Sequence, residues 1–390
     1  MAKKEKICKV VRDIPPSGIR RFFDLAAEMQ GVISLSIGEP DFVTPEHIRR
    51  TCVDKINLGS GCTSYTSNHG MIELREEIAK DLFSRHNLTY DARKEILITV
   101  GVSEALDLLF RAILSPGDEV IIPQPCYVSY VPCTIMAGGV PVIINTSPEN
   151  DFKVTAEEIE AVVTEKTKAI LLCYPNNPTG ATLTRADQEK IAQVAKKHDL
   201  IVIADDIYSH LTYGGKHSCF ASLPEMQERT IVLEGFSKAY AMTGWRVGYA
   251  AGDEEIIGAM TKIHQFTMLC APTLAQIAAI EALQNGQEER EKMIAEYDRR
   301  RKLVVQGFND LGLTCFEPRG AFYAFPCVKS TGLSSADFAE KLLMEEKVAL
   351  VPGDAFGATG AGFIRCSYAN SYENIQEALR RIERFVKKYR

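Results

Sequence analysis

The sequence has no hydrophobic run close to the roughly 20 residues that a membrane-spanning helix needs. Its strongest apolar stretches, residues 169–174 and 200–204, have the length of buried strands instead. We also expect no secretory leader, because the charged start Met-Ala-Lys-Lys-Glu-Lys is not followed by an apolar segment. We therefore expect a soluble, cytoplasmic protein without a membrane partner.

Positive and negative charges nearly balance. The formal net charge is −6, and the basic residues form only short clusters at 3–6, 299–302 and 380–390. A duplex-binding protein usually carries a basic footprint, so the sequence predicts no nucleic-acid partner. The 11 cysteines include no C-x-x-C, and the 7 histidines form no pair at H-x₃-H spacing. We expect reduced thiols and no metal site.

What the sequence does have is an alternation of short apolar runs with helix-length amphipathic stretches. The predicted strands span residues 95–100, 119–123, 140–145, 168–173, 200–205, 230–234 and 246–251. Their Ile, Leu and Val residues run almost without interruption, which is typical of strands covered on both faces in a mainly parallel sheet.

The 390 residues leave room for more than one domain. We predict an α/β fold: a large domain over residues 46–286 with a seven-stranded, mainly parallel sheet, and a smaller α+β domain over 287–390. Residues 1–45 are predicted to form an N-terminal arm and part of the small domain.

Polar residues follow four of the predicted strands, at the edge where ligands bind in open α/β sheets. Gly101-Val102-Ser103 opens a helix, Asn177 follows the fourth strand, Asp205 and Tyr208 follow the fifth, and Lys238 follows the sixth with Arg246 eight residues later. Taken alone, each is better explained as a cap, a turn or a surface charge. Their joint occurrence at successive strand ends points to a ligand.

The ligand that needs this set of groups is pyridoxal 5′-phosphate (PLP). A helix start with an arginine holds a phosphate, a buried carboxylate pairs with a protonated ring nitrogen, and a desolvated lysine forms a Schiff base with an aldehyde. A nicotinamide-binding fold is the competing interpretation, but no G-x-G-x-x-G follows the first strand.

Longer motifs carry a family resemblance. The segment Ser237-Lys-Ala-Tyr-Ala-Met-Thr-Gly-Trp-Arg-Val-Gly248, together with Asn177-Pro-Thr-Gly180 and Asp205-Asp-Ile-Tyr208, resembles the fold-type-I PLP enzymes. Within them the chain looks like a class I/II aminotransferase of the aspartate/aromatic amino acid group. The resemblance extends from the segment Ser36-Ile-Gly-Glu-Pro-Asp-Phe42 to Phe363-Ile-Arg-Cys-Ser-Tyr-Ala369.

The resemblance implies a role for each matching residue. Lys238 would be the Schiff-base lysine and the base that moves the substrate proton, Asp205 the partner of the ring nitrogen, and Asn177 and Tyr208 the donors to the phenolate oxygen. The other implied roles are ring stacking by Tyr127, phosphate binding by Gly101, Val102, Ser103, Ser237 and Arg246, and α-carboxylate binding by Arg365, Asn177 and the backbone of Gly38. Tyr65 would reach the phosphate in a neighbouring subunit, which implies a homodimer.

Two positions depart from the pattern. Many relatives have a serine where this chain has Gly235, and some acidic-substrate members have a lysine where it has Ser103. The expected reaction is a ping-pong transamination between an L-amino acid and a 2-oxo acid, with 2-oxoglutarate as the expected acceptor. Aromatic donors, aspartate and a diamino acid derivative all remain open.

Two other functions are compatible with the same motifs. A PLP-dependent C–S β-lyase would share Lys238, Asp205 and Arg365, and a non-catalytic PLP-binding module would use only the cofactor site. Near the N-terminus Ile14, Ile19, Phe22 and Phe23 either form an apolar lid over the substrate or pack in a helix.

Overall fold

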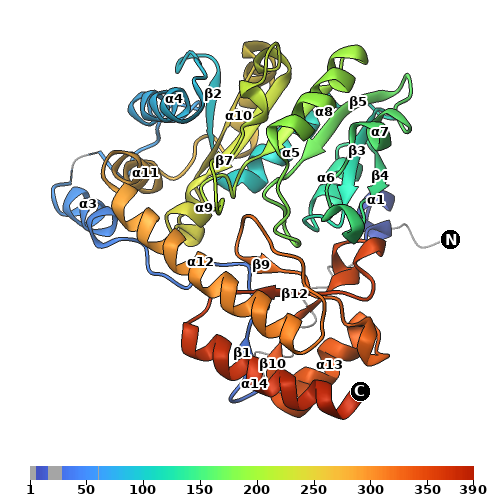
Figure 1. Ribbon diagram of the computed structural model, residues 1–390. Coiled ribbons are helices and arrows are strands. Elements are labelled where there is room, and N and C mark those ends of the chain that lie inside the picture. Colours follow the sequence, from blue (N-terminus) through green and yellow to red (C-terminus); the bar gives the residue numbers. More distant parts are fainter. Residues whose placement is uncertain (1–5, 16–28, 60) are drawn as a thin grey trace.

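The computed structural model describes residues 6–15, 29–59 and 61–390, so Ile19, Phe22 and Phe23 of the proposed lid lie outside the described residues. The centre is a seven-stranded sheet (Figure 1). Its strands, in the order β2-β8-β7-β6-β5-β3-β4, are β2 (Ile96–Thr99), β8 (Gly248–Ala251), β7 (Thr230–Gly235), β6 (Ile201–Asp205), β5 (Thr167–Leu172), β3 (Glu119–Gln124) and β4 (Val140–Asn145). Among the described strands of this sheet, β8 pairs antiparallel with both β2 and β7, and the other neighbouring pairs are parallel. The predicted seven-stranded, mainly parallel sheet is confirmed.

Both faces of the sheet are covered, which explains the uninterrupted apolar runs. In β6, Val202 and Ala204 pack into one hydrophobic cluster and Ile203 into another. Helices α5 (Gly101–Ile113) and α10 (Glu254–Thr267) cover the face of Ile203. Helices α7 (Ala156–Glu160) and α8 (Arg185–Lys197) cover the opposite face.

The second part of the molecule is built by the C-terminal residues together with a short N-terminal strand. β9 (Tyr323–Ala324), β12 (Ile364–Ser367) and β11 (Val351–Pro352) form an antiparallel sheet, and β1 (Ile33–Ser34) pairs in parallel with β10 (Val348–Ala349). The predicted smaller α+β unit is thus present. The exact boundaries proposed for the domains stay a prediction.

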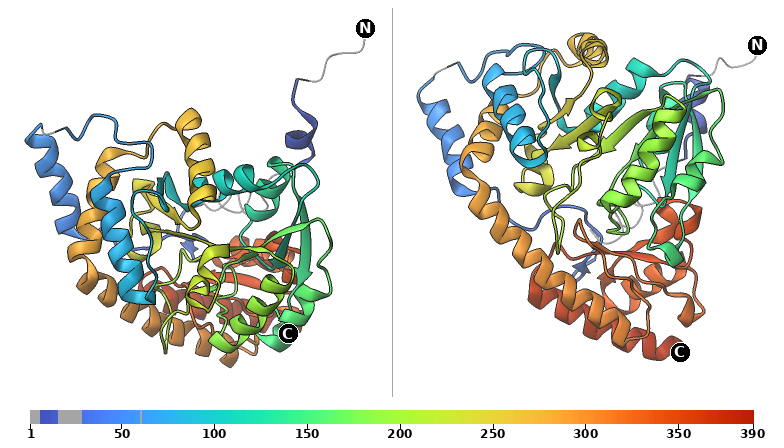
Figure 2. Two further views of the ribbon diagram at one scale, coloured as in Figure 1. Left: turned by 90° about the horizontal axis from the view of Figure 1, so that it is seen from above. Right: turned by 45° about the horizontal axis from the view of Figure 1, so that its top comes forward.

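One long helix connects the two parts. α12 (Gln287–Asp310) begins beside α11 (Thr273–Asn285) and runs down to α14 (Tyr372–Tyr389) (Figures 1 and 2). The remaining helices are α1 (Lys9–Asp13), α3 (Glu46–Asn57), α4 (Ile72–His86), α6 (Tyr130–Met136), α9 (Phe236–Ala239) and α13 (Ser335–Glu346).

Three negative findings apply to the described residues. None of their helices has both the length and the apolar content that crossing a bilayer demands. They contain no group of three or more His, Cys, Asp or Glu residues arranged to hold a metal ion. Their cysteines are all free thiols.

Candidate active site

Sheet topology brings the predicted site residues to one edge. β5, β6 and β7 are parallel, so Asn177, Asp205 and Lys238 emerge at the same end of the sheet. β8 runs the other way, so its first residues lie at that end too, and Arg246 lies two residues before it. The antiparallel β8 therefore places the cation of Arg246 at the same edge of the sheet as the amide, carboxylate and amine that follow the parallel strands.

A cavity of about 580 Å³ lies at this edge. The predicted residues that line it are Gly38, Val102, Ser103, Tyr127, Asn177, Asp205, Tyr208, Ser237, Lys238, Arg246 and Arg365. The cavity is also lined by residues that the sequence did not suggest, namely Leu106, Val128, Tyr130, Cys173, Ile207, Thr243 and Tyr323. Of the predicted set, Gly101 lies beside the cavity and Tyr65 lies away from it.

Lys238 is positioned in α9, directly after β7. Its Nζ donates a hydrogen bond to the carbonyl of Gly38 at 2.7 Å. Burial lowers the pKa of this amine to about 8, helped by the nearby Arg365 and Arg246 and opposed by Glu39. A fraction of the amine is therefore neutral near physiological pH, which is what a nucleophilic lysine requires.

Asp205 is the buried carboxylate of the site. Burial raises its pKa to about 6, while hydrogen bonds from Tyr130 and from the backbone of Ile207 act in the opposite direction. The Tyr130 hydroxyl donates to Oδ2 at 2.6 Å, and the Ile207 N–H donates to Oδ1 at 3.3 Å. A carboxylate desolvated in this way gains most from a cationic partner within the cavity.

Arg365 is fully buried between two aromatic rings. Its guanidinium carbon lies 4.6 Å from the ring centre of Tyr323 and 4.7 Å from that of Phe356. Nη1 donates to Oδ1 of Asn177 at 2.9 Å and Nη2 to the carbonyl of Ser36 at 2.6 Å. Arginine has only donors, so the Asn177 oxygen must face it, which leaves the Asn177 NH₂ free to donate elsewhere.

The Tyr208 hydroxyl forms part of a hydroxyl pair. It lies 2.9 Å from the hydroxyl of Tyr323, which comes from β9 in the second sheet. Burial raises the pKa of Tyr208 well above its usual value, so its phenol stays protonated. Tyr323 also explains why residue 38 is a glycine, because a β-carbon at that position would lie 2.5 Å from the Tyr323 hydroxyl.

The start of α5 and Arg246 together form an anion cradle. Gly101 has a left-handed φ of +73°, and a β-carbon there would lie 2.7 Å from Nη2 of Arg246. At Gly248 a β-carbon would lie 2.8 Å from the backbone nitrogen of Val102. The first N–H groups of a helix have no partners within the helix, so these glycines let an arginine approach a ready anion site.

The unusual Gly235 has a steric explanation. A β-carbon at this position would lie 3.1 Å from the Cα of Gly248 and 3.2 Å from Cγ2 of Val102. These contacts are tight enough that a serine would require the neighbouring strand or α5 to move. The close approach of β7 to β8 and α5 therefore leaves little space for any side chain at residue 235.

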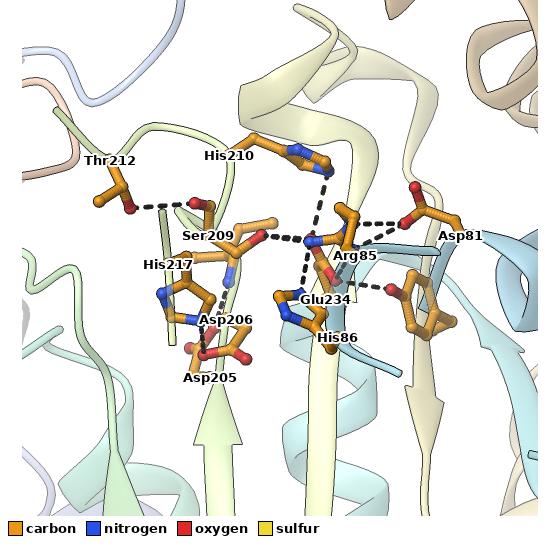
Figure 3. Close-up of polar contacts among 12 residues, drawn as sticks. Asp81, Arg85, His86, Asp205, Asp206, Ser209, His210, Thr212, His217 and Glu234 are labelled. Carbon is orange, nitrogen blue, oxygen red and sulfur yellow. Dashed lines mark hydrogen bonds and ion pairs between the residues drawn. The ribbon is translucent and has the colours of Figure 1, made fainter. Parts of the chain in front are cut away.

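A buried ionic network supports the strand that leads to Lys238 (Figure 3). Glu234, the last residue but one of β7, accepts hydrogen bonds from Arg85 at 2.8 Å, from Tyr249 at 2.7 Å and from Ser209. Burial alone would raise the pKa of Glu234, but Arg85 and the other donors hold it well below its usual range. The network anchors α4, which carries Arg85, to the sheet beneath Lys238.

The network continues to the residue next to Asp205. His217 Nε2 lies 3.2 Å from Oδ1 of Asp206, and its ring meets that of His86 edge to face with 5.9 Å between centres. His86 in turn contacts Arg85 at 3.0 Å (Figure 3). The two neighbouring aspartates thus point to different environments: Asp206 to this network and Asp205 to the cavity.

Tyr65 has 81% of its surface exposed and does not reach the cavity of its own chain. Its neighbour Ser64 accepts a hydrogen bond from Thr273 at the start of α11 at 2.7 Å, and Asn68 donates to the carbonyl of Leu269, just after α10, at 2.6 Å. Phe266, Met268 and Leu269 are exposed in the same region. Its predicted contact with a neighbouring subunit stays a prediction.

The residues fit PLP on these observations. Asp205 lines the cavity, and among the described residues its Oδ1 accepts one long hydrogen bond from the Ile207 N–H, which leaves acceptor capacity for a cationic nitrogen. The Asn177 amide has a free donor, and side chains at Gly101 and Gly248 would fill the anion cradle. Lys238 supplies an amine of lowered pKa among them.

Comparisons with known proteins identify the family of the chain. Residues 30–382 match the model of the family described as aminotransferase class I and II. An aspartate aminotransferase of Pyrococcus abyssi is 48% identical over 96% of each chain. An aromatic-amino-acid aminotransferase of Thermococcus litoralis is 45% identical, also over 96% of each chain. The crystal structure of an aromatic aminotransferase from Pyrococcus horikoshii superposes with a TM-score of 0.90 at 44% identity, over 95% of this chain and 99% of the other.

Proposed function

Given that this chain belongs to the aminotransferase class I and II family, we propose a role for each residue of its cavity and an amino donor with an aromatic side chain. The chain is a PLP-dependent aminotransferase of fold type I, and its relatives do not favour the C–S lyase alternative. The residue roles, the donor, the acceptor and the assembly are the parts that we propose.

Three residues act at the reacting end of the cavity. When bound, PLP supplies an electron sink for the pair of electrons left at the substrate Cα after its proton is removed. Lys238 would hold the cofactor through Nζ and would serve as the base that takes the proton from the substrate Cα. Asp205 holds a proton on the ring nitrogen, and Tyr208 donates to the phenolate oxygen alongside the free NH₂ of Asn177.

Other residues bind and orient. The backbone of residues 101–103 with Arg246 and Ser237 binds the phosphate, and Tyr127 stacks on the ring. Arg365 binds the substrate α-carboxylate with the N–H groups that Asn177 and Ser36 do not use, and the Gly38 backbone assists. Phe356 and Tyr323 keep the guanidinium in one plane, so the carboxylate is bound in one orientation.

The lining of the cavity carries the proposal for the donor. Beside the groups assigned to the cofactor it includes four aliphatic residues and several uncharged ones, with Ser103 where some acidic-substrate relatives have a lysine. The aliphatic residues are Val102, Leu106, Val128 and Ile207, and the uncharged ones include Tyr130, Cys173, Thr243 and Tyr323. Among the described lining residues, the cations are Lys238, Arg246 and Arg365, and each already has a role at the cofactor or the α-carboxylate. The cavity therefore favours phenylalanine or tyrosine over aspartate as donor. We keep 2-oxoglutarate as the proposed acceptor on the family resemblance alone, because the described lining offers no further cation to its distal carboxylate.

The donor is tested by single half-reactions without an oxo acid. We expect kcat/KM for phenylalanine and tyrosine to exceed that for aspartate by about tenfold or more, since one unmet carboxylate costs at least 1.4 kcal/mol. Ser103→Lys should raise the value for aspartate selectively. A wild-type preference for aspartate would overturn the donor proposal while leaving transamination intact.

A homodimer completes the proposal. Tyr65 reaches the cofactor phosphate bound by a second copy, and that copy covers the exposed Phe266, Met268 and Leu269. Mixing Tyr65→Ala with Lys238→Ala subunits tests this, because a mixed dimer has one site with an intact Lys238 and an intact Tyr65. We expect recovery of about a quarter of wild-type activity after random reassociation. Activity no higher than that of Tyr65→Ala alone would contradict a shared site.

We also propose a cytoplasmic location. The 11 free cysteines support it, because a reducing compartment keeps thiols from pairing. Fractionation of the source cells tests the location, with the protein followed by antibody and its activity by assay.

A further inference from the structure

Tyr130 occupies a position between the cofactor groups that its sequence context does not reveal. It is the first residue of α6, and only 1% of its surface is exposed although it lines the cavity. Its hydroxyl donates to Oδ2 of Asp205 at 2.6 Å, across 75 residues of sequence. The short, charge-assisted geometry marks this as the strongest hydrogen bond that Asp205 receives.

The same side chain also contacts the residue assigned to the ring face. The rings of Tyr130 and Tyr127 meet edge to face, with 5.6 Å between centres and 79° between planes. Backbone support comes from Thr134, whose hydroxyl donates to the Tyr130 carbonyl at 2.9 Å. Tyr130 therefore touches both Tyr127 and Asp205, which we assigned to the face and the nitrogen of one ring.

The two oxygens of Asp205 are not equivalent. Oδ2 is held by Tyr130, whereas Oδ1 receives only the longer 3.3 Å bond from the Ile207 N–H. We propose that Tyr130 is a positioning residue that fixes the Asp205 carboxylate, so that Oδ1 is the oxygen presented to the PLP ring nitrogen, and that braces Tyr127 against the ring. This inference rests on the proposed roles of Asp205 and Tyr127.

The charges around Asp205 agree with this role. It is faced by Tyr130 from α6, by the Cys173 thiol after β5, by Asp206 on its own chain segment and by Lys238 from α9. Burial raises the pKa of the Asp205 carboxyl to about 6, Tyr130 and Lys238 lower it, and Asp206 raises it. Burial and Asp205 keep the pKa of Tyr130 well above its usual value, so Tyr130 remains a donor throughout the range in which Asp205 titrates.

The test compares Tyr130→Phe with Tyr174→Phe. Tyr174 is also a buried tyrosine of the large domain, but its hydroxyl bonds only to the backbone of residues 152 and 154, away from the cavity. Apoenzyme is titrated with PLP between pH 5 and 9, and the dissociation constant is measured at each pH. Affinity should be lost as the pH falls and Asp205 becomes protonated, because a neutral carboxyl no longer pairs with the ring cation.

Tyr130→Phe should weaken PLP binding by about 10- to 100-fold, the value of a hydrogen bond to a charged group. It should also move the pH midpoint of affinity upward, since the carboxyl has lost the donor that favours its ionised form. In the holoenzyme kcat should fall while KM for the donor stays within about twofold, because Arg365 is untouched. Tyr174→Phe should leave the midpoint, kcat and KM unchanged.

The double variant Tyr130→Phe/Asp205→Asn decides whether Tyr130 acts through Asp205. If it does, Tyr130→Phe has little further effect once Asp205 is replaced. A Tyr130→Phe enzyme with the dissociation constant and midpoint of Tyr174→Phe would overturn the inference, as would full additivity in the double variant. If Asp205→Asn alone binds PLP and turns over normally, the proposed role of Asp205 fails instead.

Discussion

Replacing Arg365 by lysine separates the charge of the carboxylate site from its geometry. In the wild type the two terminal nitrogens of Arg365 are each committed to one protein oxygen, at 2.9 Å to Asn177 and 2.6 Å to Ser36. Each nitrogen carries a second hydrogen, so one remains on each for the α-carboxylate that we propose Arg365 binds. Lysine keeps one positive centre but loses the planar fork and the stacking between Tyr323 and Phe356.

The expected loss follows from that count. One of two charge-assisted hydrogen bonds to the substrate disappears, and each contributes about 1.5–3 kcal/mol, so kcat/KM for the amino donor should fall roughly 10- to 150-fold. The half-reaction is followed under single-turnover conditions through the change in cofactor absorbance on adding the donor. Cofactor binding, measured separately, should persist because Lys238, Asp205 and Arg246 are unchanged. A kcat/KM within about twofold of wild type would refute the assignment of Arg365.

Three further predictions follow from the site. Glu234→Gln leaves the buried Arg85 with less compensation, so the free energy of unfolding in urea should fall by about 3–5 kcal/mol. The rate at which apoenzyme recombines with PLP should rise as pH increases through about 8, because Lys238 is protonated and non-nucleophilic below its pKa and neutral above it. Stopped-flow absorbance measures this rate at each pH. Gly101→Ala puts an alanine at a left-handed backbone position and places its methyl group 2.7 Å from Arg246 Nη2. The dissociation constant for PLP, measured by equilibrium titration, should therefore rise about tenfold or more. An unchanged dissociation constant would refute the proposed anion cradle.

The sheet could be predicted because its strands have a recognisable sequence pattern. A strand buried on both faces needs apolar residues at successive positions, and no other element of similar length shows that pattern as clearly. The residues at strand ends were predictable for the same reason, since topology brings parallel carboxyl ends together whatever the loops do. Asn177, Asp205 and Lys238 line one cavity on that account.

Tyr130 and Tyr323 could not be found in this way. Tyr130 begins a helix a few residues beyond its strand, and its contact with Asp205 depends on how α6 packs. Tyr323 belongs to another sheet, and its hydroxyl meets Tyr208 across 115 residues of sequence. Both contacts depend on the packing of whole elements, for which the local sequence carries no signal. The nearest hint for Tyr130 was its place in the segment Pro125–Tyr130 with Tyr127.

The donor specificity was not predictable either, because the lining side chains come from separate segments. The four residues proposed as an apolar lid contribute nothing to that question here: Ile14 is half-buried, and the other three lie outside the described residues.

The residues assigned to the reaction and those proposed to contact the substrate side chain lie on different elements, and this separation has an evolutionary consequence. Lys238 and Asp205 are carried by β7–α9 and β6, whereas Ser103 and Leu106 belong to α5. On the proposed roles, side-chain substitutions at positions such as 103 and 106 of α5 would alter which amino acid is accepted while leaving Lys238 and Asp205 in place. A lineage built on this plan is free to change its substrate repeatedly while inheriting one chemistry, and relatives of this chain are accordingly named for both aspartate and aromatic amino acids.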